Sequence, residues 1–257
     1  MSLLCETLAA VLYERKKPMR LDKFLADMGY GSRKEVKQLI KKGLVTVNGQ
    51  VIKSDKAQVQ ETQDTVCFEG EPIAYQSQFY YLLNKPAGVI SATVDSYEET
   101  VLDLFSEEAF REDLFPVGRL DKDTEGFLLI TNDGGLAHQL LSPKKHVEKE
   151  YYAQVEGIMT AEDQKIFAKG IKLDGEWTLP AELQILNVDE EEMRSEIKLI
   201  LHEGKFHQVK RMVHAVGKEV VYLKRIRMGG LSLPDDLALG EYRELTSEEM
   251  AKLQERG

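Results

Sequence analysis

The spacing of hydrophobic positions near the N-terminus predicts two short helices. Apolar residues between 21 and 28 recur at the i, i+3, i+4 and i+7 spacing of an amphipathic helix, and Gly29 ends that pattern. A second helix is predicted from Ser32, because Glu35 completes a capping box, and Gly43 stands at the usual C-terminal position. We therefore expect a helical pair at the start of the first domain.

A tight hairpin follows these helices, and the second helix is strongly cationic on one side. The apolar segment LVTV, the turn dipeptide Asn48-Gly49 and the segment QVI are typical of a two-residue hairpin. Apolar side chains share one side of the second helix, whereas the other side carries the cations Arg33, Lys34, Lys37 and Lys41. These cations could solvate an ordinary surface helix or contact an anionic ligand, and the pattern alone leaves both interpretations open.

The later part of the chain contains a buried strand with a polar loop in front of it. The segment FYYLLNKPAGVISA begins with an aromatic and apolar strand and then predicts a turn at Lys85-Pro86-Ala87-Gly88. The run FLLIT is continuous and apolar, as in a strand that is buried on both faces, and NDGG then predicts a turn and LAHQL a helix. Asp121 lies in the loop before FLLIT, where a carboxylate can be held rigidly and partly desolvated.

Length and composition predict two domains in a reducing compartment. For 257 residues we expect an extension or short amphipathic helix at 1–18, a small domain at 19–76 and a larger one at 77–257. No apolar run is long enough to span a membrane, and Cys5 and Cys67 form neither a CxxC pair nor a zinc pattern. We expect a soluble, cytoplasmic monomer.

The net charge of −10 conceals two basic regions. Between Arg15 and Lys56, twelve Lys or Arg residues face four acidic ones, a local balance of +8, so the rest of the chain sums to −18. A second basic stretch, from His202 to Arg227, carries seven Lys or Arg residues against two acidic ones. Two basic regions on an acidic chain favour two contact surfaces for one anionic ligand.

The N-terminal segment resembles a known RNA-binding domain. The sequence RLDKFLADMGYGSRKEVKQLIKKGLVTVNGQVI has the layout of the domain named for ribosomal protein S4. This resemblance implies that the cationic side of the second helix binds RNA, because a row of cations on a rigid helix can follow a phosphate backbone without reading sequence. It favours Arg33, Lys37 and Lys41 for phosphate contacts, with Lys34 beside them.

Three further segments resemble motifs of the RNA pseudouridine synthases, in the order that this family has them. The longest, GRLDKDTEGFLLITNDG, places Asp121 at the family's catalytic position. The second contains Tyr151 where the family has a tyrosine that contacts the target base. The third, residues 203–212, places Lys210 where a basic residue pairs with the aspartate and favours its ionised form.

The resemblance also implies a reaction and a fold. Pseudouridine formation breaks the bond from C1′ to N1 of uridine and remakes it to C5 without net redox change, so neither a metal nor a nucleotide cofactor is expected. Arg119 would fill the space of the flipped base or hold a phosphate, and Arg211 would add to the RNA contacts. The implied class is α+β, with a mixed, largely antiparallel sheet flanked by helices and an active-site cleft across its middle.

Finer features resemble the small-subunit pseudouridine synthase A group of this family. They are the S4-like segment, the lysine-containing QVKRM and the C-terminal GGLSLPDDLALGEYRELTSEEM. The implied partner is ribosomal RNA, and the implied target is one uridine of 16S ribosomal RNA, of the uridine-516 type. A large-subunit (23S) synthase of the same family is the nearest alternative.

Other readings of these residues stay open. A ribosome-binding module could keep the fold without turnover, although a pure binder would not need the carboxylate. A glycoside or nucleoside hydrolase could use Asp121 with Asp123 as acid and base, although it would leave the basic N-terminal segment unexplained. The histidines 202, 207 and 214 do not share one helical face and have no cysteine partner, which favours a structural or RNA-contact role.

Overall fold

The computed structural model describes residues 18–61, 63–142 and 145–254, which form two compact units divided between Ser77 and Gln78. The extension expected at residues 1–18 lies outside the described residues except for its last residue. None of the described helices is long and apolar enough to cross a membrane. Each unit has a hydrophobic core of its own, so the two are described separately.

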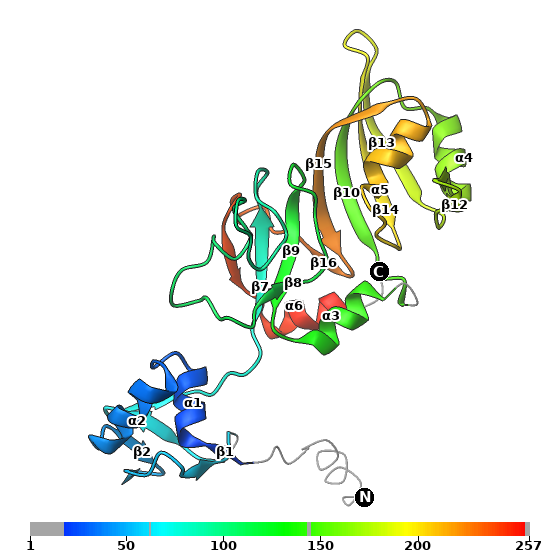
Figure 1. Ribbon diagram of the computed structural model, residues 1–257. Helices are drawn as coiled ribbons and strands as arrows, with labels where there is room; N and C mark the ends of the chain where they lie inside the picture. The colour runs from blue at the N-terminus through cyan, green and yellow to red at the C-terminus, as the bar shows by residue number, and fades with distance from the viewer. Residues whose placement is uncertain (1–17, 62, 143–144, 255–257) are drawn as a thin grey trace, which may run out of the picture. The chain divides into compact units, whose positions relative to one another are not determined.

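The first unit packs two helices against short strands (Figure 1). Helices α1 (Leu21–Asp27) and α2 (Arg33–Lys41) contact each other, and their apolar side chains form a core with residues of the strands. Strands β3, β2, β5 and β6 form one sheet, and β1 pairs with β4. The strands are β1 (Met19–Arg20), β2 (Val45–Val47), β3 (Gln50–Val51), β4 (Gln58–Val59), β5 (Val66–Phe68) and β6 (Glu71–Ile73).

Local sequence signals account for the start of α2 and for the hairpin after it. The Ser32 hydroxyl accepts a hydrogen bond from the backbone N–H of Glu35, and the Glu35 carboxylate accepts one from the backbone N–H of Ser32 at 2.8 Å. Asn48 and Gly49 adopt φ angles of 50° and 77°, which a tight hairpin turn between β2 and β3 requires. The predicted capping box and hairpin are therefore confirmed.

A nine-stranded sheet dominates the second unit. Its main order is β13-β14-β10-β15-β9-β7-β17, with β16 beside β15 and β8 beside β9. Among the strands described here, only β9 and β15 pair in parallel, which confirms a mixed, largely antiparallel sheet and the α+β class. The strands are β7 (Tyr80–Lys85), β8 (Phe115–Pro116), β9 (Glu125–Thr131), β10 (Lys149–Glu156), β11 (Lys172–Leu173), β12 (Glu176–Trp177), β13 (Glu182–Asp189), β14 (Arg194–Leu201), β15 (Glu219–Met228), β16 (Leu231–Ser232) and β17 (Tyr242–Glu244).

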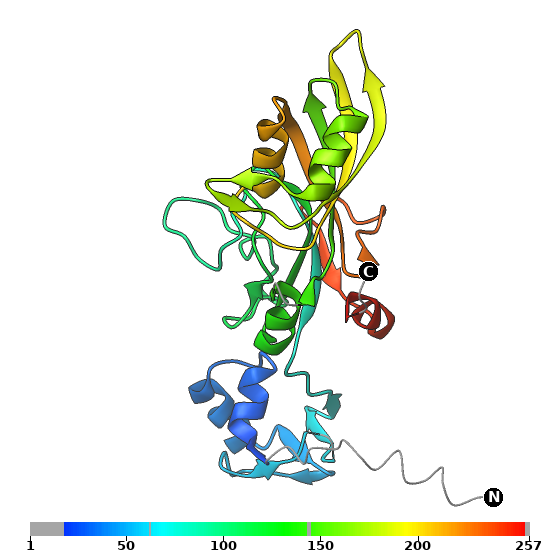
Figure 2. The same ribbon diagram turned by 90° about the vertical axis from the view of Figure 1, so that its right-hand side faces the viewer.

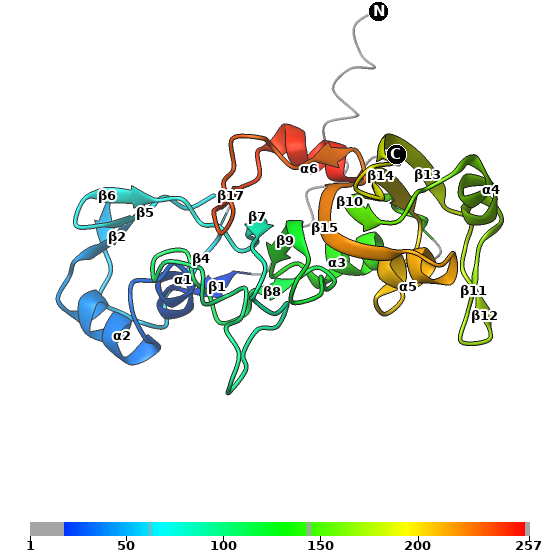
Figure 3. The ribbon, with the colours of Figure 1, turned by 90° about the horizontal axis from the view of Figure 1, so that it is seen from above.

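Helices cover both faces of this sheet, and β9 is buried on both sides as predicted. Leu128 and Ile130 of β9 join the core that includes α4 and α5, whereas Phe127 and Leu129 join the core that includes α3 and α6. Figure 3 shows α4 with the β11–β12 pair at the β13 end of the sheet, and Figure 2 shows the β13–β14 hairpin extending beyond the helices. The helices are α3 (Gly134–Leu141), α4 (Ala161–Lys169), α5 (Gln208–Ala215) and α6 (Ser247–Gln254).

Helix α3 begins earlier than the sequence predicted. Asp133 caps the helix, because its side chain accepts a hydrogen bond from the backbone N–H of Leu136 at 3.0 Å. Gly134 and Gly135 are therefore helical, and the prediction that they belong to a turn was wrong. An N-cap aspartate stabilises the first turn enough to include two glycines, which have low helix propensity.

Gly126 permits the close approach of β9 and β15 at the centre of the sheet. It pairs with Arg225 and has a φ of 102°, and a Cβ atom at this position would lie 2.2 Å from the Arg225 carbonyl oxygen. Any larger residue would push the two strands apart. The pairing brings the loop before β9 close to α5, which precedes β15, so the two segments that resemble the first and third motifs meet in space.

Candidate active site

The loop between β8 and β9 is held by hydrogen bonds to its backbone. The Ser91 hydroxyl accepts a hydrogen bond from the Leu120 N–H at 3.0 Å and donates one to the Leu120 carbonyl at 2.9 Å. The buried Lys85 ammonium at the end of β7 donates to the carbonyl oxygens of Asp121 at 3.2 Å and Thr124 at 2.9 Å. These contacts fix the backbone from which the Asp121 side chain projects.

The Asp121 carboxylate contacts two side chains near the start of α5. Lys210 Nζ lies 3.2 Å from Asp121 Oδ2, and His207 Nε2 lies 3.5 Å from Asp121 Oδ1. His207 caps α5 in the left-handed region, with a φ of 48°, and its ring stacks on Phe206 with 3.8 Å between centroids. The Asp121 side chain is 25% exposed. It is therefore held from two sides and still accessible to a ligand.

Lys210 contacts two carboxylates rather than Asp121 alone. Its Nζ lies 2.5 Å from Oδ1 of Asp123, whose side chain is 73% exposed. Burial by itself would lower the pKa of Lys210, but the hydrogen bond to Asp123 and the charge of Asp121 outweigh it, so that this pKa is raised. The hydrogen bond from Lys210 also lowers the pKa of Asp123, against the effect of burial. Lys210 is thus a firmly protonated cation between the two aspartates.

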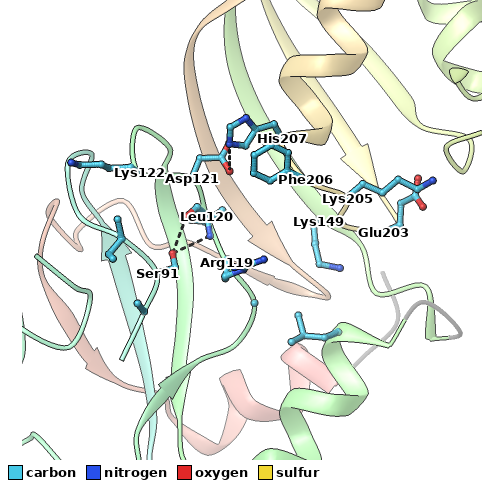
Figure 4. Close-up of a pocket in the computed structure, with 15 residues that line it drawn as sticks. Ser91, Arg119, Leu120, Asp121, Lys122, Lys149, Glu203, Lys205, Phe206 and His207 are labelled. Carbon is cyan, nitrogen blue, oxygen red and sulfur yellow. Dashed lines mark hydrogen bonds and ion pairs between the residues drawn. The ribbon is translucent and has the colours of Figure 1, made fainter. Parts of the chain in front are cut away.

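A cavity of about 600 Å³ opens beside Asp121 (Figure 4). Arg119, Lys149, Phe206 and His207 line it together with Asp121. A smaller adjoining cavity of about 70 Å³ is lined by both Asp121 and Tyr151, and the side chain of Tyr151 comes from β10 and is 8% exposed. The larger volume lies in the usual range of small-molecule sites. The carboxylate therefore faces a space that can admit a flipped nucleotide.

The cations expected to contact RNA differ in their surroundings. Arg33, Lys34 and Lys41 on α2 are exposed. Lys37 is half-buried, with its Nζ 3.8 Å from Asp22 and 3.5 Å from Asp55, so part of its charge is already compensated. Arg211 on α5 forms an ion pair with Asp174 and donates a hydrogen bond to the Phe206 carbonyl at 3.3 Å, which holds the segment before α5 in place.

Three residues of the site were not singled out for it from the sequence. His207 was considered only as one of three histidines without helical spacing, and its contact with Asp121 depends on the left-handed turn before α5. Lys85 and Lys149 belong to strands and carry no sequence signal of burial near a cavity. Within the described ranges, no three His, Cys, Asp or Glu side chains form a group that could hold a metal ion.

Two family models match this chain. The model of the RNA pseudouridylate synthases matches residues 79–215, which contain Asp121, Tyr151 and Lys210, and the S4 domain model matches residues 19–66. The chain belongs to the RNA pseudouridylate synthase family. A solved structure described as a pseudouridylate synthase is 36% identical, with a TM-score of 0.63, and the match covers 91% of this chain and 99% of that one.

Relatives with similarity over nearly their whole length carry several names. The uncharacterized RNA pseudouridine synthase YtzG of Bacillus subtilis is 51% identical, over 92% of this chain and 99% of the relative. The ribosomal small subunit pseudouridine synthase A of Vibrio cholerae is 42% identical, over 91% of this chain and 99% of the relative. The ribosomal large subunit pseudouridine synthase B of Bacillus subtilis is 40% identical, over 91% of this chain and 95% of the relative.

Proposed function

We propose that this enzyme converts one uridine of 16S ribosomal RNA to pseudouridine, at a site of the uridine-516 type, with Asp121 as the catalytic carboxylate. The observation that carries the proposal is the Asp121 side chain, which lines both cavities and is held by Lys210 at 3.2 Å. The chain acts as a cytoplasmic monomer on ribosomal RNA or on an assembly intermediate of the small subunit. It needs no metal or nucleotide cofactor.

The reaction assigns a task to each residue around the cavity. The target nucleotide leaves its stack and enters the cavity, where Tyr151 stacks on the uracil and Arg119 fills the vacated space or holds a phosphate. Asp121 acts in its ionised form as nucleophile or base while the bond from C1′ to N1 breaks and the bond to C5 forms. The C5 proton then leaves and N1 regains a proton, so the product has the composition of the substrate. Lys210 stabilises the carboxylate throughout.

Contacts outside the cavity supply affinity for the rest of the RNA. The exposed cations Arg33, Lys34 and Lys41 on α2 contact phosphates, and Lys37 contributes less because it already pairs with two aspartates. Arg211, on α5, adds a further contact with the RNA. The choice of the small subunit rests on the resemblance of the C-terminal segment and on relatives named small subunit synthase A. The relative named large subunit synthase B supports the 23S alternative.

Substituting the two neighbouring aspartates separately tests the catalytic assignment. Asp121→Asn is expected to abolish the release of tritium from C5-labelled uridine in a 16S transcript, while its affinity for the transcript persists. Asp123→Asn is the matched control, because Asp123 shares Lys210 but is mostly exposed, and it is expected to keep turnover within a few-fold. Wild-type turnover in Asp121→Asn would refute the assignment. Free uracil as the product would indicate a hydrolase, and RNA binding without any product would indicate a binding module.

Mapping pseudouridines in cellular ribosomal RNA tests the substrate. Ribosomal RNA is compared between cells with and without the gene, and complementation with the wild-type chain or Asp121→Asn serves as the control. We expect one 16S site to lose its pseudouridine and only the wild-type chain to restore it. Loss of a 23S site instead would show that the large-subunit alternative is correct.

A further inference from the structure

Lys149 is a buried lysine at the cavity that lacks a compensating negative charge. It begins β10, is 6% exposed and lines the large cavity. Its ammonium donates a hydrogen bond to the Val147 carbonyl at 3.2 Å, and it forms no ion pair with any carboxylate of the described residues. A buried ammonium with one carbonyl partner has unused capacity for an anion.

A second buried cation strengthens the positive field at this point. Arg225 on β15 is 2% exposed, donates from Nε to the Phe127 carbonyl at 2.8 Å, and its Nη2 finds no hydrogen-bond partner among the described residues. Burial, followed by repulsion from Arg225, lowers the pKa of Lys149 to about 8. At neutral pH Lys149 is still mainly charged, so folding carries the cost of two uncompensated charges.

Two other lysines of the cavity wall are already paired with carboxylates. Lys205 pairs with Glu176 at 3.2 Å, and Lys122 pairs with Glu98. Glu203, a carboxylate of the wall, accepts hydrogen bonds from the Leu179 N–H and the Gln208 amide, both at 2.8 Å. Of the lysines that line the cavity, Lys149 is therefore the one without a carboxylate partner among the described residues.

Arg119 completes a two-cation site on the same side of the cavity. It is exposed and forms no ion pair with a described carboxylate, and Figure 4 shows it with Lys149 below Asp121, His207 and Phe206 in the view. We propose that Lys149 and Arg119 together bind one backbone phosphate of the RNA strand next to the target uridine. The inference rests on the proposed function and deepens it, because it adds a phosphate contact inside the cavity.

A phosphodiester fits this site better than a base or a ribose. It brings the negative charge that Lys149 lacks, and its two free oxygens can accept hydrogen bonds from an ammonium and a guanidinium at the same time. Bound there, the phosphate fixes the backbone on one side of the flipped nucleotide while Tyr151 and Asp121 contact its base and sugar on the other. Lys149 is then a positioning residue whose main effect is on RNA affinity.

Neutral linkages in a synthetic RNA stem-loop test this site. Dissociation constants are measured in the Asp121→Asn background, so that the RNA is not converted, with single methylphosphonates scanned through the linkages around the target uridine. We expect one linkage at which the neutral group weakens binding about tenfold, and we expect that loss to vanish when Lys149→Met is added. Lys149→Met itself should weaken binding of the all-phosphate RNA about tenfold and reduce the salt slope by about 0.7.

Controls separate this site from general charge effects and from failure to fold. Lys165→Met removes an exposed lysine of α4 that pairs with Glu162, and it should change neither the affinity nor the methylphosphonate profile. Arg119→Met removes an exposed side chain and should abolish the response at the same linkage, which keeps the test valid if Lys149→Met misfolds. Equal weakening by the methylphosphonate with and without Lys149 would overturn the inference. Conversion of the stem-loop by the wild-type chain is scored separately, so a failure of the proposed function stays distinguishable.

Discussion

Two buried lysines with similarly lowered pKa values should respond in opposite ways to the same substitution. Lys149 and Lys85 are 6% and 0% exposed, and burial is the main cause that lowers the pKa of each to about 8. Lys85 donates to four carbonyl oxygens at distances from 2.9 to 3.3 Å, whereas Lys149 donates to one at 3.2 Å. We expect Lys149→Met to raise the free energy of unfolding at pH 7 and Lys85→Met to lower it.

The magnitudes follow from the pKa values and the hydrogen bonds. For Lys149, a fall of the pKa from 10.5 to about 8 corresponds to about 3 kcal/mol of cost for the charged form. Methionine removes this cost and one charged hydrogen bond, which at 3.2 Å is worth about 1.5 kcal/mol, so a net gain of about 1–2 kcal/mol is expected. For Lys85 the relief is also about 3 kcal/mol, but its three protons are shared among four carbonyl oxygens. Three charged hydrogen bonds at about 1.5–3 kcal/mol each sum to about 4.5–9 kcal/mol, which gives a net loss of about 2–6 kcal/mol.

The pH dependence of stability distinguishes the cost of burying a charged lysine from a packing effect of methionine. Below about pH 8 the folded wild-type chain carries the whole penalty of the charged Lys149. Between about pH 8 and 10.5 the folded state has released the proton and the unfolded state still binds it, so stability increases with pH. The advantage of Lys149→Met should therefore shrink above pH 8.

Urea unfolding between pH 7 and 10 measures these differences. The fluorescence of Trp177, the one tryptophan of the chain, reports on the second unit, and circular dichroism reports on the whole chain. The reasoning would be refuted if Lys149→Met were less stable than the wild-type chain at pH 7, or if its advantage did not depend on pH. Lys85→Met should also lower kcat more than it raises KM, because Lys85 holds the backbone of Asp121.

Three other substitutions have defined outcomes. Tyr151→Leu should weaken RNA binding in a filter assay about tenfold, since stacking on a base is lost, whereas Tyr151→Phe should bind as the wild-type chain does. The hydrogen bond from Arg243 lowers the pKa of Glu249 to about 2, so Glu249→Gln should lower stability by about 1–3 kcal/mol at pH 7. The Arg243–Glu249 pair stabilises the folded state only while Glu249 is ionised. The difference in stability between Glu249→Gln and the wild-type chain, measured by thermal unfolding, should therefore disappear as the pH falls from about 4.5 to 2. The double variant Arg33→Gln with Lys41→Gln should reduce the salt slope of RNA binding by about 1–2 and leave turnover at saturating RNA unchanged.

Sequence by itself determined the features that depend on neighbouring residues. The capping box of Ser32 and Glu35, the turn at Asn48-Gly49 and the doubly buried strand β9 all follow from side chains within a few positions of one another. The family motifs also lie in continuous segments, which is why the membership of the chain could be inferred from the residues alone. The start of α3 was missed, because the cap by Asp133 outweighed the turn preference of two glycines.

Tertiary structure decided which charged side chains share the cavity and which of them are compensated. His207 contacts Asp121 because the chain turns in the left-handed region before α5, and Lys210 divides its charge between two aspartates of one loop. Lys149 begins a strand like many others, yet the pairing of β10 with β15 buries it near the cation Arg225, and it has no carboxylate partner among the described residues. Burial and charge compensation depend on strands that are distant in sequence, so no local pattern encodes them.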